Sequence, residues 1–219
     1  MIITIDGPAG VGKSTVAQML AQKLGFDFLN TGAMYRCAAL ASIEANIPLD
    51  ASEKIVDCVK SLRFEQKGPR IFLSGRDVTE RIRQKDVTQL VSPIADIIPL
   101  RHVLIEWQKE FAQGRDIVTE GRDQGSVVFH DADCKIFLTA TPEIRAKRRT
   151  DQLQRMGIDA HFDQILKDQI LRDELDAKRP FGALRPASDC VVIQSDDLSM
   201  EQVIEQMLSI VRKKSQSSQ

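Results

Sequence analysis

The chain has 219 residues, of which 30 are lysine or arginine, 31 are aspartate or glutamate and 42% are hydrophobic. This length can bury one sizeable core, and the net charge of −1 gives no basic field of the kind that nucleic-acid binders use. Without a membrane-length apolar run or a leader pattern, and with four scattered cysteines, the sequence predicts a cytoplasmic protein with reduced thiols.

Apolar runs alternate with helical patterns along the chain. The apolar runs predict five strands, at residues 2–5, 26–29, 116–119, 135–138 and 190–193. Helices are predicted at 16–24, 33–45, 53–62, 82–113 with interruptions near Pro93 and Pro99, 142–156, 162–178 and 200–213. A polar Ser/Gln tail is expected to be frayed. Short strands separated by helices predict an α/β fold with a parallel five-stranded sheet flanked by helices.

The pattern changes between residues 63 and 80. Short β-like pieces at 63–65, 70–73 and 77–78 are separated by Gly- and Pro-containing turns. Such turns between short strands predict a small antiparallel β insertion.

The most specific motif follows the first strand. The pattern G-x-x-x-x-G-K-[ST] is satisfied by Gly7, Pro8, Ala9, Gly10, Val11, Gly12, Lys13 and Ser14, followed by Thr15. Its glycines let backbone N–H groups turn toward a phosphate, and the helix N-terminus adds partial positive charge. We expect Lys13 to bridge the β- and γ-phosphates and Ser14 to bind magnesium. The motif predicts nucleotide binding but does not separate kinases, hydrolases and switches.

Two predicted helices carry clusters of charged side chains that add little to the stability of an exposed helix surface. The helix predicted at 142–156 carries an arginine cluster, Arg145, Arg148 and Arg149. Like charges at this spacing repel, so either an anion meets them or they form a solvated basic face. The next helix carries a row at i, i+4 and i+7, Arg172, Asp176 and Arg179. This row is either a surface ion-pair ladder or a ligand-facing set.

Polar segments also follow two predicted strands, at residues 30–36 and 120–125. Ligands bind at the carboxyl ends of the strands in open parallel sheets, so both segments are candidates for the site. A glycine turn with exposed charges is the alternative for 120–125, and Thr31 could simply cap the following helix.

Together these segments resemble the bacterial cytidylate (CMP) kinases over nearly the whole chain. The matching segments are IDGPAGVGKST, TGAMYR, EGRDQGSVVF, KIFLTAT with EIRAKRR, and the Arg172–Asp176–Arg179 row. The resemblance implies one P-loop kinase domain over 1–219, with a core at about 1–50 and 82–219. It also implies a β-rich insertion at about 63–80 that binds the nucleoside monophosphate, and a lid at about 142–160. The implied substrates are ATP with Mg²⁺ and CMP or dCMP, and we expect a monomer that binds neither nucleic acid nor membrane.

The resemblance also implies a role for individual residues. The ATP phosphates and magnesium would be held by Gly10, Gly12, Lys13, Ser14 and Thr15. The CMP phosphate would be held by Arg36, Arg122 and Arg172, near Thr31 and Tyr35. Cytosine would be read by Ser92, Arg101, Asp123 and Arg179, and the ribose by Asp176. The lid over ATP would carry Arg145, Arg148 and Arg149. The candidate catalytic cations are therefore Lys13, Arg122, Arg145 and Arg149.

Two positions depart from the family, which often carries Asp where this chain has Asn30 and Glu120. Both positions are expected near a magnesium-bound water. We therefore expect that water to be held less firmly, without loss of activity. The main alternative is another small-molecule P-loop kinase, acting on a different nucleoside monophosphate, shikimate or dephospho-coenzyme A. A GTPase switch would need NKxD and DxxG motifs, and an ABC-type ATPase module would need a complete signature sequence; the chain has neither.

Overall fold

The computed structural model describes residues 1–217, and the chain divides into two compact units. The first, here called the P-loop unit, comprises Met1–Phe28 and the chain from Asp116 onward; the second unit comprises Leu29–Arg115. The predicted division into core, insertion and lid stays a prediction. No helix within residues 1–217 is both long and apolar enough to span a membrane.

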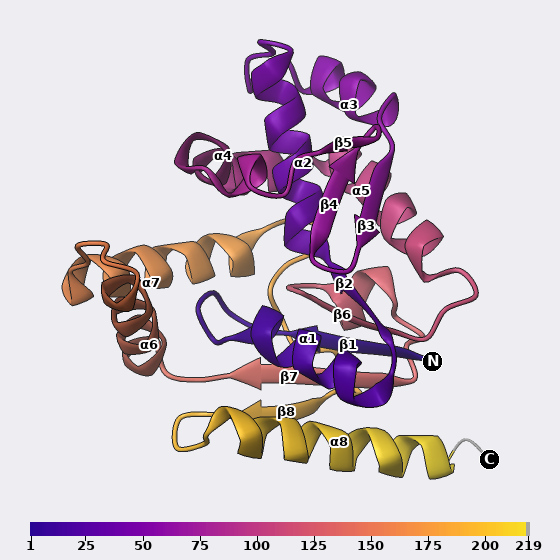
Figure 1. The fold of residues 1–219 in the computed structure, drawn as a ribbon, viewed down its shortest axis with the longest axis vertical. Helices are drawn as coiled ribbons and strands as arrows, with labels where there is room; N and C mark the ends of the chain where they lie inside the picture. Colours follow the sequence, from indigo (N-terminus) through magenta and orange to yellow (C-terminus); the bar gives the residue numbers. More distant parts are fainter. Residues whose placement is uncertain (218–219) are drawn as a thin grey trace. The chain divides into compact units, whose positions relative to one another are not determined.

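A five-stranded parallel sheet with strand order β2-β6-β1-β7-β8 supplies the framework of the P-loop unit (Figure 1). Its strands are β1 (Ile2–Asp6), β2 (Asp27–Asn30, of which the last two residues belong to the second unit), β6 (Ile117–Gly121), β7 (Cys134–Thr139) and β8 (Val191–Gln194). In β1 the side chains alternate, as they do in any strand. Ile3 and Ile5 join the apolar core, whereas Thr4 and Asp6 are buried polar residues.

The helices of the P-loop unit are α1 (Lys13–Leu24), α6 (Pro142–Arg155), α7 (Phe162–Lys178) and α8 (Met200–Ser217), with a π-helical segment η2 (Gln124–Val128) after β6. Val16 and Leu20 of α1 and Met207 of α8 pack in the same core cluster as the apolar side of β1. Because α1 is anchored in this way, the loop between β1 and α1 is held at the carboxyl end of the central strand.

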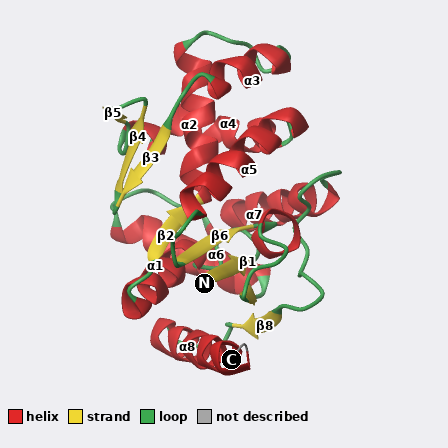
Figure 2. Cartoon of the chain, turned by 90° about the vertical axis from the view of Figure 1, so that its right-hand side faces the viewer, coloured by secondary structure: helices red, strands yellow, loops and turns green. Residues whose placement is uncertain are grey.

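The second unit has its own core. Its helices are α2 (Thr31–Glu44), α3 (Ser52–Lys60), α4 (Lys85–Ala95) and α5 (Ile98–Ala112), with a 3₁₀ turn η1 (Arg81–Arg83). Its antiparallel sheet, drawn in yellow in Figure 2, consists of β3 (Phe64–Lys67), β4 (Arg70–Leu73) and β5 (Arg76–Asp77). Met34, Leu40, Ile55, Ile94 and Leu104 are fully buried in its apolar cluster.

The predicted fold class is confirmed: an α/β chain with a five-stranded parallel sheet and a small antiparallel sheet. The predicted break in the helix at 82–113 falls between the two prolines, because Pro93 lies inside α4 and Pro99 in the first turn of α5. The helix α8 continues to Ser217, so the first part of the tail predicted to be frayed is helical. The rest of that tail, 218–219, lies outside the described residues.

Candidate active site

The phosphate-binding loop at residues 7–12 depends on its glycines. Gly10 and Gly12 have positive φ angles of 77° and 97°, which residues with a side chain rarely adopt. A β-carbon at Gly7 would lie 2.0 Å from the carbonyl oxygen of Leu138. The helix α1 begins directly after the loop, and no side chain caps it. Its first N–H groups and its dipole are therefore available to an anion.

Lys13 and Ser14 occupy the first turn of α1. The Lys13 side chain is buried, and its Nζ donates a hydrogen bond to the Pro8 carbonyl at 2.8 Å. Burial and the nearby Arg122 cation lower the pKa of Lys13 to about 7, although the Glu120 and Asp6 carboxylates act in the opposite direction. The Lys13 amine is thus held beside the loop, where the negative charge of a bound polyphosphate would favour its protonated form.

This lowered pKa predicts proton uptake when ATP binds. At pH 8 the ligand-free Lys13 amine is mostly neutral; the anionic triphosphate raises its pKa, so binding takes up as much as one proton. Below about pH 6 the amine is already charged and the uptake disappears. Titration calorimetry in buffers of different ionisation enthalpy measures this number. Lys13→Arg, which stays charged at every pH, is the matched control; equal uptake by both proteins at pH 8 would contradict the prediction.

Asp6 is a residue of this region that the sequence interpretation missed. It ends β1, is 4% exposed, and accepts hydrogen bonds from the backbone N–H groups of Gln124 and Gly125 at 2.8 Å each. Burial raises the pKa of Asp6 to about 7 although these two bonds lower it. Asp6 therefore fixes the start of η2, directly after Arg122 and Asp123. The available signal was a carboxylate at a strand end immediately before a glycine-rich loop.

Arg122, Asp176 and Arg179 form an ion-pair cluster in which Asp176 and Arg179 are buried and Arg122 is half-buried. Arg122 Nε donates to Asp176 Oδ2 and Arg179 Nη2 donates to Asp176 Oδ1, both at 2.8 Å. Burial alone would raise the pKa of Asp176, but the Arg122 and Arg179 cations outweigh it and hold that pKa below its usual value. Loss of solvent around Arg172 and the proximity of Arg122 lower the pKa of Arg172. With Arg172 included, three guanidinium groups lie near the one carboxylate of Asp176. This excess of positive charge favours an incoming anion.

Arg145 is more buried than its predicted place on a lid suggests. Its residue exposure is 3%, its Nε donates to the Ala140 carbonyl at 3.0 Å, and its Nη1 donates to the Ala9 carbonyl at 2.7 Å. Arg145 thus contacts the phosphate-binding loop itself.

The other two arginines of the predicted lid cluster, both on α6, bind different partners. Arg148 donates to the hydroxyl and the carbonyl of Ser195, whereas the exposed Arg149 donates to Gln152 Oε1 at 2.8 Å. The structure therefore does not gather Arg145, Arg148 and Arg149 at one point. Their action as a lid over ATP stays a prediction.

In the second unit the structure corrects the expected helix cap. Asn30, not Thr31, is the N-cap of α2, and its Oδ1 accepts a hydrogen bond from the Ala33 N–H at 3.1 Å. Thr31 is the first helical residue and is buried. Asn and Asp are about equally strong N-cap residues, so Asn30 keeps the capping role that Asp would have at this position.

The substrate-binding residues predicted in the second unit are partly brought together. The Arg101 guanidinium lies 5.6 Å from the centre of the Tyr35 ring, within cation–π range. Arg101 is 2% exposed, and its Nη1 donates to the Ala95 carbonyl at 3.1 Å. Arg36 follows Tyr35 on α2, and Ser92 lies on α4; both are half-buried.

The predicted cytosine-reading set divides between the units. Ser92 and Arg101 belong to the second unit, whereas Asp123 and Arg179 belong to the P-loop unit, where both are buried. Whether the four residues act on one base stays a prediction.

Comparison with known proteins identifies the family. The model of the family described as cytidylate kinase matches residues 3–213. The chain belongs to the cytidylate kinase family. It is 46% identical to the cytidylate kinase of Rhodopirellula baltica, covering 100% of this chain and 95% of that protein. It is 41% identical to that of Caldanaerobacter subterraneus, covering 96% and 94%.

A solved structure supports the fold alone. An uncharacterized protein from Eubacterium ventriosum matches with a TM-score of 0.51 and 17% identity, covering 97% of this chain and 98% of that one. With the family established, this cytidylate kinase family member is a phosphotransferase, and its substrates are nucleotides.

The residues of this cytidylate kinase family member fit magnesium held together with a nucleotide. Ser14 Oγ donates to Glu120 Oε1 at 3.0 Å, so a hydroxyl and a carboxylate lie together at the start of α1. Magnesium prefers such oxygen ligands and usually keeps waters and phosphate oxygens in its shell. Among residues 1–217 no group of three or more His, Cys, Asp or Glu side chains could hold a metal by itself. The donor set therefore suits an ion that arrives with ATP.

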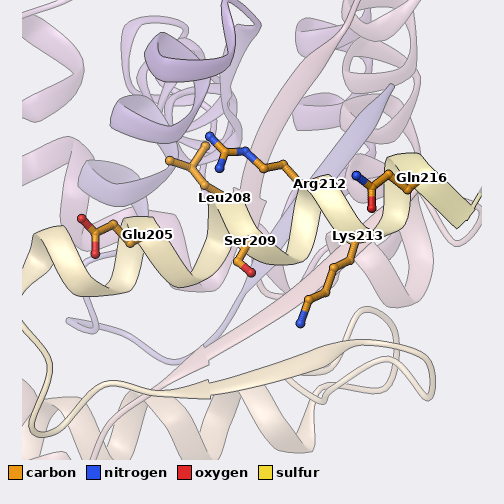
Figure 3. Close-up of a pocket in the computed structure, with 6 residues that line it drawn as sticks. All are labelled: Glu205, Leu208, Ser209, Arg212, Lys213 and Gln216. Atoms are coloured by element: carbon orange, nitrogen blue, oxygen red, sulfur yellow. The ribbon is translucent and has the colours of Figure 1, made fainter.

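A hollow on α8 contains none of these residues (Figure 3). It is lined by residues of this one helix, Glu205, Leu208, Ser209, Arg212, Lys213 and Gln216. Ligand sites generally need polar groups that converge from several elements. The phosphate-binding loop, and not α8, is therefore the candidate active site of this family member.

Proposed function

We propose that the protein transfers the γ-phosphoryl group of MgATP to the phosphate of CMP or dCMP, giving ADP and CDP or dCDP. One observation carries this proposal beyond family membership. The buried Lys13 of the phosphate-binding loop lies within electrostatic range of Arg122 and Arg172, which surround the carboxylate of Asp176. Cations suited to a triphosphate and cations suited to an anionic acceptor therefore occur within the same unit, which supports the proposal.

The chemistry requires positioning and charge, not a base. An ionised oxygen of the CMP phosphate attacks the γ-phosphorus in line, and the bond from that phosphorus to the β–γ bridging oxygen breaks. Lys13 stabilises the charge on the transferring group, while Arg122, Arg172 and Arg36 hold the acceptor phosphate. Magnesium, when bound, neutralises charge on the ATP phosphates. Ser14 and Glu120 are the residues that would hold it.

The preference for cytosine over uracil follows from the hydrogen-bond donors and acceptors of the proposed site. Cytosine offers the O2 and N3 acceptors and the N4 amine, which suit donors from Ser92, Arg101 and Arg179 and the carboxylate of Asp123. Uracil has a carbonyl in place of the amine, so Asp123 would face another acceptor and reject it. Asp176 would accept from the ribose hydroxyl. The cytoplasmic location and monomeric state stay predictions.

A coupled ADP-release assay with an acceptor panel tests the proposal. The panel contains CMP, dCMP, UMP, AMP, GMP, shikimate and dephospho-coenzyme A, each with MgATP. We expect kcat/KM for CMP to exceed that for UMP by at least about 10²-fold, or about 2.7 kcal/mol. Turnover of another acceptor without CMP would keep the ATP site and overturn the roles of Ser92, Arg101, Asp123 and Arg179.

A further inference from the structure

One face of α7 lies against the phosphate-binding loop. Gln169 is buried, and a β-carbon at Gly10 would lie 2.3 Å from its Nε2 atom. One turn further along, Asp173 Oδ1 accepts a hydrogen bond from the backbone N–H of Ala9 at 3.0 Å. Residues four apart share one face of a helix. The first part of this face therefore contacts the backbone of the loop directly.

Arg145 of α6 binds both partners of this contact, Asp173 and Ala9. Its Nη1 lies 2.6 Å from Asp173 Oδ2 and donates to the Ala9 carbonyl at 2.7 Å. The side chains of Arg145 and Asp173 are 4% and 19% exposed. Both oxygens of Asp173 are thus engaged, and both polar backbone atoms of Ala9 are held. Charge-assisted bonds of this kind are stronger and more directional than neutral ones.

The row assigned to the acceptor lies beside Asp173 on the neighbouring side of α7, and it ends at Arg179, the residue directly after the helix. Arg172 adjoins Asp173, and Asp176 and Arg179 follow at about 4.5 and 9 Å along the helix axis, from a rise of about 1.5 Å per residue. Asp176 is also fixed to Arg122 at 2.8 Å. A shift of α7 at Asp173 would therefore move the acceptor row relative to the loop that holds ATP.

We propose that Asp173 is a positioning residue for phosphoryl transfer: with Arg145 it fixes α7, the helix that carries the acceptor row, to the backbone of the phosphate-binding loop. This role rests on the proposed function. Asp173 contacts neither nucleotide in it, so loss of Asp173 slows transfer without weakening binding. Since a misplacement of about 1 Å can cost about 10²-fold in rate, we expect kcat to fall by about 10- to 100-fold.

Asp173→Asn tests this role because it keeps the size and one acceptor oxygen but removes the charge that Arg145 needs. Glu174→Gln is the matched control: it makes the same change one residue away, where the side chain is 57% exposed and pairs with Lys178 at 3.6 Å. We expect Asp173→Asn to lower kcat while both KM values stay within about threefold of wild type. The ratio of ADP released to CDP formed should rise, because a misplaced acceptor lets water compete. Glu174→Gln should leave all three quantities unchanged.

Asp173→Glu keeps the charge but displaces the carboxylate by one methylene, and it is measured in the same way if Asp173→Asn fails to fold. An unchanged kcat and ADP-to-CDP ratio would overturn the proposal. Tighter MgATP binding with unchanged kcat would also overturn it, because the contact would then only obstruct the loop in the nucleotide-free protein. Failure of the proposed function is separate: wild type would form no CDP, and the variants would be compared on the panel acceptor that does turn over.

Discussion

Replacing Lys13 by alanine should lower kcat by about 10³-fold or more while the protein remains folded. Loss of one preorganised group that stabilises transition-state charge typically costs about 10²–10³-fold, and in the proposed mechanism Lys13 binds the transferring phosphoryl group. The fold should survive because burial lowers the pKa of Lys13 to about 7, so the ligand-free protein gains little from its charge. The coupled ADP-release assay and thermal unfolding measure the two effects.

Lys23→Ala is the matched control for this prediction. Lys23 lies in the last turn of the same helix and is exposed, so the change removes an equal charge away from the loop. Its activity should equal that of wild type. Activity of Lys13→Ala within tenfold of wild type would show that Lys13 is not the catalytic cation.

Arg122→Ala should raise KM for CMP by at least about 10²-fold, or about 2.7 kcal/mol, while the affinity for MgATP changes less than about threefold. In the proposed site the Arg122 guanidinium supplies charge and a directional fork for the acceptor phosphate, which a lysine would not reproduce. Asp176 would keep its bond to Arg179 at 2.8 Å, so the buried carboxylate would not be left unpaired. Initial rates with CMP varied, together with calorimetry of MgATP, separate the two affinities.

A second readout follows from the same substitution. The Arg122 cation lowers the pKa of Lys13, so Arg122→Ala should raise that pKa and reduce the proton uptake measured on ATP binding at pH 8. Arg212→Ala, on the exposed side of α8, is the control for loss of one arginine. An unchanged KM for CMP combined with weaker MgATP binding would assign Arg122 to the ATP site instead.

Features that depend on a few consecutive residues could be predicted from the sequence. The phosphate-binding loop is one, because positive φ angles at Gly10 and Gly12 and the Lys-Ser start of α1 are local requirements. The face shared by Asp176 and Arg179 is another, because helical periodicity alone sets it. The turns around residues 67–69 and 74–75 likewise predicted the antiparallel sheet.

Only the tertiary structure decided which partners these residues have. Asp6 holds a segment 118 residues away, and Asp173 holds the loop 164 residues before it; a lone carboxylate carries no sequence signal for such a pairing. The choice of Asn30 over Thr31 as helix cap depended on where β2 ends. Local conformation follows from the intrinsic preferences of neighbouring residues. Pairing and burial depend on the packing of distant segments, and that packing fixes the pKa of Lys13 and the contact that holds α7 to the loop.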